Sequence, residues 1–135
     1  MRVARRLPKP GREYRVPPLT DPKRLAAYRD VLENWSVTDY IQFDLTEQSL
    51  RWIQRELGSI TLKDLGRRMF EHVQAGGKID EVPETRAEWS GQYEFHHDLR
   101  LTIHAKRVYI ETCLNYRLPV VADESWILVV NVHEC

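Results

Sequence analysis

The sequence predicts an α+β fold, with about three N-terminal helices packed on one face of a three- to four-stranded antiparallel sheet. Three observations lead to this prediction. Apolar residues recur at helical spacing through residues 22–75, alternate strictly with polar residues from residue 93, and occupy both faces of residues 126–133. The sheet is therefore expected to come mainly from the C-terminal third of the chain.

The first twenty residues are predicted to form a disordered, basic, proline-rich arm, followed by a single α+β domain over residues 21–135. Residues 1–15 carry six basic residues against one glutamate, although the whole chain of 135 residues has 20 basic and 20 acidic residues. Such an arm could recruit RNA or another anionic surface, or it could be a solubilising tail without a partner.

Each of the three expected helices follows a residue that can accept a hydrogen bond as its N-cap. The helices span residues 22–34, 47–57 and 62–75, after Asp21, Thr46 and Thr61. Gly58 and Gly76-Gly77 are placed to end the second and third helices. Residues 37–43, between the first two helices, favour either a short strand or an extended linker.

Three strands are expected over residues 93–104, 107–114 and 126–133. The first has apolar odd positions and polar even positions, which is typical of an antiparallel strand with one buried face. A tight turn at Ala105-Lys106 would join the first two strands, placing Leu101 opposite Ile110 and Arg100 opposite Glu111. The third strand is apolar on both faces and is therefore expected to be central.

The polar face of this hairpin carries the candidate site. It is expected to gather the side chains of His96, Arg100, His104, Tyr109 and Glu111. Histidine transfers protons near neutral pH, arginine stabilises developing negative charge, and tyrosine donates to a ligand or stacks on it. Glu111 would orient Arg100. These residues suit phosphodiester cleavage, and they equally suit a solvated sheet surface held by cross-strand pairs.

Other classes of site are not indicated. The sequence has no histidine or cysteine spacing typical of a metal site, no glycine-rich phosphate loop and no dinucleotide fingerprint, so neither metal nor cofactor is expected. Cys113 is expected to pack rather than to act as a nucleophile. With no apolar run long enough for a bilayer and only two cysteines, no membrane partner and a cytoplasmic location are expected.

The element order and three short motifs resemble the RelE- and MqsR-like ribonuclease toxins of bacterial toxin–antitoxin systems. The motifs are Glu-Leu-Gly at residues 56–58, Arg-Val-Tyr-Ile-Glu at residues 107–111 and Ser-Trp-Ile-Leu-Val-Val-Asn-Val at residues 125–132. The resemblance covers residues 55–135, and in it Tyr109 matches a strand tyrosine implicated in cleavage. Where the family usually has a basic residue near its C-terminus, this sequence has Glu134 and Cys135.

Two functions therefore stay open. The resemblance implies a metal-independent endoribonuclease of toxin type that acts on RNA and binds a small antitoxin-like protein. The alternative is a non-catalytic protein-interaction module, which would bind its partner through the basic arm or the exposed sheet.

Overall fold

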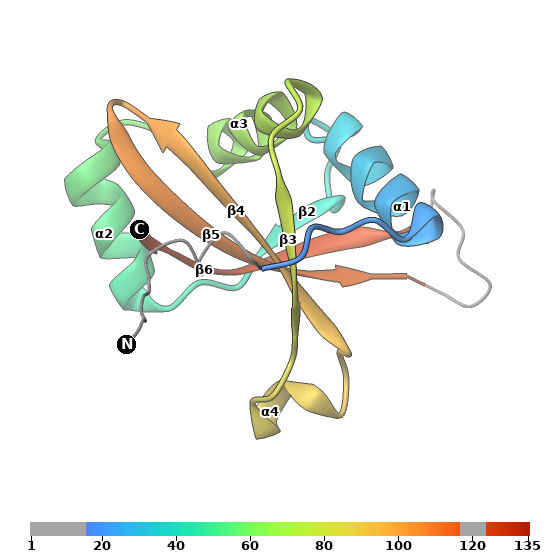
Figure 1. The fold of residues 1–135 in the computed structure, drawn as a ribbon. Coiled ribbons are helices and arrows are strands. Elements are labelled where there is room, and N and C mark those ends of the chain that lie inside the picture. The colour runs from blue at the N-terminus through green and yellow to red at the C-terminus, as the bar shows by residue number, and fades with distance from the viewer. Residues whose placement is uncertain (1–15, 117–123) are drawn as a thin grey trace, which may run out of the picture.

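The structure is a computed structural model that describes residues 16–116 and 124–135. In this part of the chain the fold is α+β, as predicted, with four helices and an open five-stranded sheet (Figure 1). The helices are α1 (Pro22–Glu33), α2 (Glu47–Leu57), α3 (Leu62–Gln74) and α4 (Ala87–Ser90). The strands are β2 (Ile41–Phe43), β3 (Ile79–Pro83), β4 (Phe95–Ile103), β5 (Lys106–Asn115) and β6 (Trp126–Glu134).

The first three helices begin at the residues that the sequence marks as caps. Asp21 Oδ2 accepts a hydrogen bond from the backbone N–H of Arg24 at 2.9 Å. Thr61 and Asp64 form a capping box, in which each side chain accepts from the backbone N–H of the other residue. Gly58 ends α2 with a φ of 63°, a conformation that glycine adopts without steric cost.

One hydrophobic core lies between these helices and one face of the sheet. Figure 1 shows α1 and α3 side by side, and α2 near the C-terminal end of β6. The helices contribute Tyr28, Val31, Leu32, Ile53, Leu57, Leu65, Met69 and Val73, and the three longest strands contribute Leu99, Leu101, Ile103, Val108, Ile110, Leu114, Ile127, Val129 and Val132. The odd-numbered side chains of β4 thus point inward, as their alternation predicts.

The sheet differs from the prediction in strand number and direction. Its order is β2-β6-β5-β4-β3, and β2 runs parallel to β6 while the other neighbours are antiparallel, so the sheet is mixed rather than antiparallel. The central place of β6 is confirmed. Strand β3 was not predicted, because its polar residues Asp80 and Glu81 and its final Pro83 are typical of a loop. It is an edge strand, where a terminal proline is tolerated.

The register of the β4–β5 hairpin differs from the predicted one by two residues. The turn is His104-Ala105, not Ala105-Lys106, and it places Leu99 opposite Ile110 and Leu101 opposite Val108. His104 and Ala105 have φ values of 51° and 66°. Two-residue hairpin loops favour positive φ at both central positions, because that backbone twist matches the twist of the strands. A shift of two residues preserves which face each side chain occupies.

The face of the sheet opposite α1, α2 and α3, here called the open face, is only partly covered. A small apolar cluster of Tyr93, Cys113 and Val130 forms on it, with Trp89 of α4 and Leu128 packed alongside. The remainder of the open face is polar. None of the described helices has the length and apolar character needed to cross a bilayer.

The segment before α1 runs beside the edge strand β3. The backbone N–H of Leu19 donates to the carbonyl of Ile79 at 2.8 Å, and that of Glu81 donates to the carbonyl of Pro17 at 2.8 Å. Most of the arm predicted over residues 1–20 lies outside the described residues.

Candidate functional site

Four of the five predicted site residues lie on the open face. Arg100 of β4 is directly opposite Tyr109 of β5, and the next pair on this face joins Asp98 to Glu111. His96 is two positions before Asp98 on β4 and therefore shares its face. The alternation along β4 was sufficient to predict this grouping.

His104 does not join the group. It lies in the β4–β5 turn, where its side chain is exposed and its backbone no longer follows the alternation of the strand. The predicted turn placed His104 at the end of the first strand, facing the same side as Tyr109. Because the turn begins one residue earlier than predicted, His104 is part of the turn and loses that placement.

A buried carboxylate, Asp98, connects two of the predicted residues. Its side chain is only 3% exposed. Asp98 Oδ1 lies 2.7 Å from Nδ1 of His96, and Oδ2 accepts a hydrogen bond from the Tyr109 hydroxyl at 2.9 Å. The carboxylate thereby fixes the imidazole and the phenol on the same face of the sheet.

This arrangement changes the proton affinities of both partners. Burial alone would lower the pKa of His96, but the hydrogen bond and the negative charge of Asp98 outweigh it, so the pKa of His96 is raised. Burial and the adjacent Asp98 carboxylate raise the pKa of Tyr109. The phenol therefore stays protonated at neutral pH and acts as a hydrogen-bond donor.

Glu111 pairs with Arg86 and not with Arg100, so its predicted role of orienting Arg100 is wrong. Nη2 of Arg86 donates to Glu84 Oε1 at 2.8 Å and also donates to Glu111 Oε2. Hydrogen bonds from Arg86 lower the pKa of Glu84 to about 2, despite its burial. Glu84 and Arg86 lie in the segment that leads from β3 into α4, where no helix or strand was predicted.

The same cluster contains a set of side chains that could hold a cation. One ligand atom each from Glu84, His96 and Glu111 lies within 4.8 Å of the others. One imidazole and two carboxylates suit several divalent metals. Here the Arg86 guanidinium lies between the two carboxylates and pairs with both, so the cluster is an ion-pair network.

Arg100 is oriented by the edge strand β3. Its guanidinium pairs with Asp80, whose other carboxylate oxygen lies 3.2 Å from Nζ of Lys78. Asp80 replaces Glu111 as the orienting carboxylate because β3 pairs with β4 and places Asp80 opposite Asp98. Both Arg100 and Lys78 remain more than 40% exposed in their side chains, so their charges still reach solvent.

An ordered stack of three side chains faces an open depression. The Arg100 guanidinium lies 5.2 Å from the centre of the Tyr109 ring, and that ring stacks on His133 of β6 at 4.7 Å with an interplanar angle of 29°. The depression has a volume of ≈ 940 Å³. Arg107, Asn131, Glu134 and Cys135 also line it.

Sequence reasoning missed His133, Asp80 and Arg86. The positions of β3 and β6 in the sheet could not be derived from the hairpin alone, and each of these residues joins the site through one of those neighbours. One pattern in the sequence could have identified His133 as a site residue. It and Asn131 are alternating polar residues at the end of an otherwise apolar strand, as expected where a central strand becomes exposed.

Cys113, weighed as a nucleophile from the sequence, is a packing residue in the second apolar cluster. Cys113 is 0% exposed, and burial raises the pKa of its thiol to about 12. A thiol that is protonated and inaccessible at neutral pH is a poor nucleophile.

No family model, no curated protein and no solved structure matches this chain.

Proposed function

We propose that this chain is a metal-independent endoribonuclease of toxin type, which cleaves single-stranded RNA on the open face of its sheet. The observation that carries this proposal is the stack of Arg100, Tyr109 and His133 beside the depression. It brings together a cation, a phenol and an imidazole, the groups that phosphodiester transesterification uses.

Each residue of the stack has a separate role in the proposed reaction. His133 accepts the proton of a ribose 2′-hydroxyl, and the 2′-oxygen attacks the adjacent phosphorus. Arg100 stabilises the charge that develops on the phosphate oxygens. The bond from phosphorus to the 5′-oxygen breaks, and that oxygen takes a proton from Tyr109 or from water. The products are a 2′,3′-cyclic phosphate and a 5′-hydroxyl.

A second groove supports an RNA path away from the depression. It has a volume of ≈ 420 Å³ and shares Asn131 and His133 with the depression. Arg51, Trp52 and Arg55 of α2 line its other side. Arginines beside an aromatic ring are suited to bind the phosphates and stack on the bases of a single strand. The basic arm over residues 1–20 would add attraction to RNA, and an antitoxin-like protein would be the expected partner.

The order of the elements also supports the toxin type. Helices α2 and α3 precede the antiparallel run of β3, β4, β5 and β6. This is the plan on which the resemblance to ribonuclease toxins was based.

The test is expression in bacteria together with cleavage of RNA by the purified chain in the presence of a metal chelator. The wild-type chain should arrest growth and cleave RNA, while Arg100→Ala and His133→Ala should do neither. His104→Ala is the matched control, because this histidine lies in the exposed turn. Full activity of Arg100→Ala would refute the proposed site.

A non-catalytic interaction module is the second candidate, and the charge pairing of the open face favours it. Arg86 pairs with Glu84 and Glu111, while Lys78 and Arg100 share Asp80. Paired charges bind phosphate less well than free ones. If this candidate is correct, the chain should leave RNA intact and should bind a protein whose binding is lost when the open face or the arm is altered.

A further inference from the structure

Two residues of β6, Asn131 and His133, line both the depression and the groove beside α2. They lie opposite Glu111 and Tyr109, which are two positions apart on β5, so both belong to the open face. Residues two apart on a strand are separated by about 7 Å. One nucleotide can span that distance, so a nucleotide whose ribose lies at His133 can place its base at Asn131.

A β-bulge precedes Asn131 on β6. Glu111 of β5 lies opposite Asn131. The next residue of β5, Thr112, lies opposite Val129, so Val130 is an extra residue in β6. Bulges bend a strand locally, re-aim its side chains and are common beside active sites. Such a bend accounts for the position of Asn131 at the border between the depression and the groove.

The side-chain amide of Asn131 is held in one orientation by Ser49 of α2, a residue that is only 4% exposed. The backbone N–H of Val132 donates to Ser49 Oγ at 3.4 Å, and the Ser49 hydroxyl donates to Asn131 Oδ1 at 3.1 Å. A buried hydroxyl that accepts one hydrogen bond still needs an acceptor for its own proton. The oxygen of the Asn131 amide therefore faces Ser49, and its nitrogen, Nδ2, is directed away from it.

The Asn131 amide thus offers donors alone. Within residues 16–116 and 124–135, Nδ2 of Asn131 makes no hydrogen bond. An amide with both its oxygen and its nitrogen free pairs with adenine, which presents an acceptor beside an amino group. Here the oxygen is engaged by Ser49. Uracil, cytosine and guanine each have a carbonyl oxygen that can accept from Nδ2, and adenine is the RNA base that lacks one.

We propose that Asn131 selects the base on the 5′ side of the scissile phosphate and favours uracil, cytosine and guanine over adenine. This selection rests on the proposed function, because His133 acts on the 2′-hydroxyl of the same nucleotide. Asn131 is the residue that contacts the base, and Ser49 is a positioning residue that sets the orientation of its amide.

The test is cleavage of four oligonucleotides that differ at one position. Each is a 2′-O-methyl RNA strand with a single unmodified adenosine, guanosine, cytidine or uridine, so that only this position can be cleaved through a 2′-hydroxyl. The wild-type chain should cleave the adenosine strand with a kcat/KM about fivefold or more below that of the other three. Asn131→Ala should remove this preference. Ser49→Ala should reduce it, because the freed Oδ1 can then accept from the adenine amino group.

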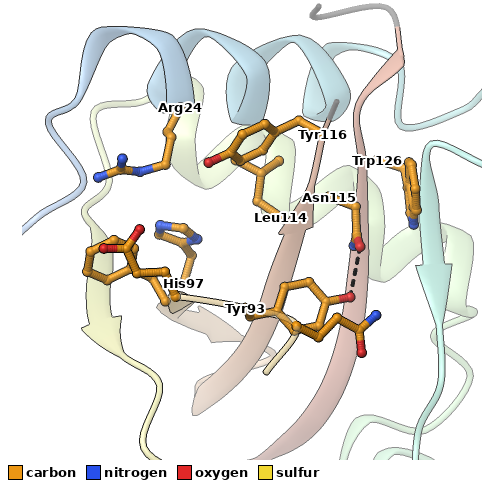
Figure 2. Close-up of a pocket in the computed structure, with 10 residues that line it drawn as sticks. Arg24, Tyr93, His97, Leu114, Asn115, Tyr116 and Trp126 are labelled. Carbon is orange, nitrogen blue, oxygen red and sulfur yellow. Dashed lines mark hydrogen bonds between the residues drawn. The ribbon is translucent and has the colours of Figure 1, made fainter. Parts of the chain in front are cut away.

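Tyr93→Phe is the matched control, because it removes the same kind of hydrogen bond at a different place. Tyr93 lies in a separate pocket near α1, where its hydroxyl donates to Asn115 Oδ1 at 2.8 Å (Figure 2). This variant should keep the wild-type ratio between the four strands. The ratio is the readout because a loss of folded chain lowers the cleavage of all four equally.

Two failures of this experiment have different meanings. Equal cleavage of the four strands by the wild-type chain, or an unchanged ratio in Asn131→Ala, overturns the selection by Asn131 and leaves the cleavage site in place. Cleavage of none of the four strands contradicts the cleavage site itself, and the selection with it.

Discussion

Replacement of Arg86 by alanine should destabilise the fold, because it leaves the carboxylates of Glu84 and Glu111 without the arginine that pairs with both. The side chains of Glu84 and Glu111 are 1% and 4% exposed. The pKa of Glu84 falls from 4.5 to about 2 in the folded chain. At about 1.4 kcal/mol per pKa unit, this difference corresponds to about 3 kcal/mol at neutral pH. Because the Arg86 side chain is 40% exposed and partly screened, we expect a loss of about 2 kcal/mol in the free energy of unfolding.

The loss should depend on pH in a defined direction. A carboxyl whose folded pKa is lowered stabilises the fold above its unfolded pKa, and this contribution disappears as the pH falls through the folded pKa. For Glu84 the window runs from 4.5 down to about 2. The difference between the wild-type chain and Arg86→Ala should therefore be largest at pH 7 and fall by about half near pH 3.

Urea unfolding of both chains at the two pH values measures this difference. Arg51→Ala is the control, because Arg51 and its partner Glu47 are 69% and 76% exposed and their pair should contribute less than about 1 kcal/mol. Adding Glu111→Gln to Arg86→Ala should recover part of the stability. Equal effects of the Arg86 and Arg51 replacements, or an Arg86 effect that is independent of pH, would show that the buried carboxylates do not need this arginine.

Three further outcomes are expected. Arg100→Ala should reduce the rate of RNA cleavage by about 10²-fold or more, measured with a defined oligonucleotide, while His104→Ala should leave it unchanged. Ala105→Gly should raise the free energy of unfolding by about 1 kcal/mol, because glycine adopts the observed φ of 66° without steric cost; an unchanged midpoint in urea would contradict this. Tyr28→Phe should lower that free energy by about 1 kcal/mol, because it removes a buried hydrogen bond of 2.8 Å to Thr112, and a neutral effect would argue against the bond.

Local patterns predicted the parts of the fold that local physics determines. Caps such as Asp21 and Thr61 mark the helix starts, and the alternation along β4 identifies its buried face. The predicted register of the hairpin was wrong, because His104 and Ala105 form the turn without the glycine or asparagine that usually identifies one. A two-residue error leaves the faces intact, which explains why the polar grouping survived.

The candidate site was predictable only where it lies within the hairpin. Arg100 and Tyr109 are adjacent on the two strands, so alternation was enough to place them on one face. Their partners Asp80 and His133 come from β3 and β6, and these pairings depend on the tertiary arrangement of the sheet. The polar residues Asp80 and Glu81 did not indicate a strand, because the arginines that pair with them, Arg100 and Arg24, are distant in sequence.

The most direct test of the central claim is to incubate the purified chain and a chelator with a single-stranded RNA and with its 2′-O-methyl analogue. The proposed reaction requires cleavage of the RNA alone, with a 2′,3′-cyclic phosphate on the product, and loss of cleavage in His133→Ala. Intact RNA, or equal cleavage of both strands or by both proteins, would contradict the assignment of Arg100, Tyr109 and His133 as a cleavage site.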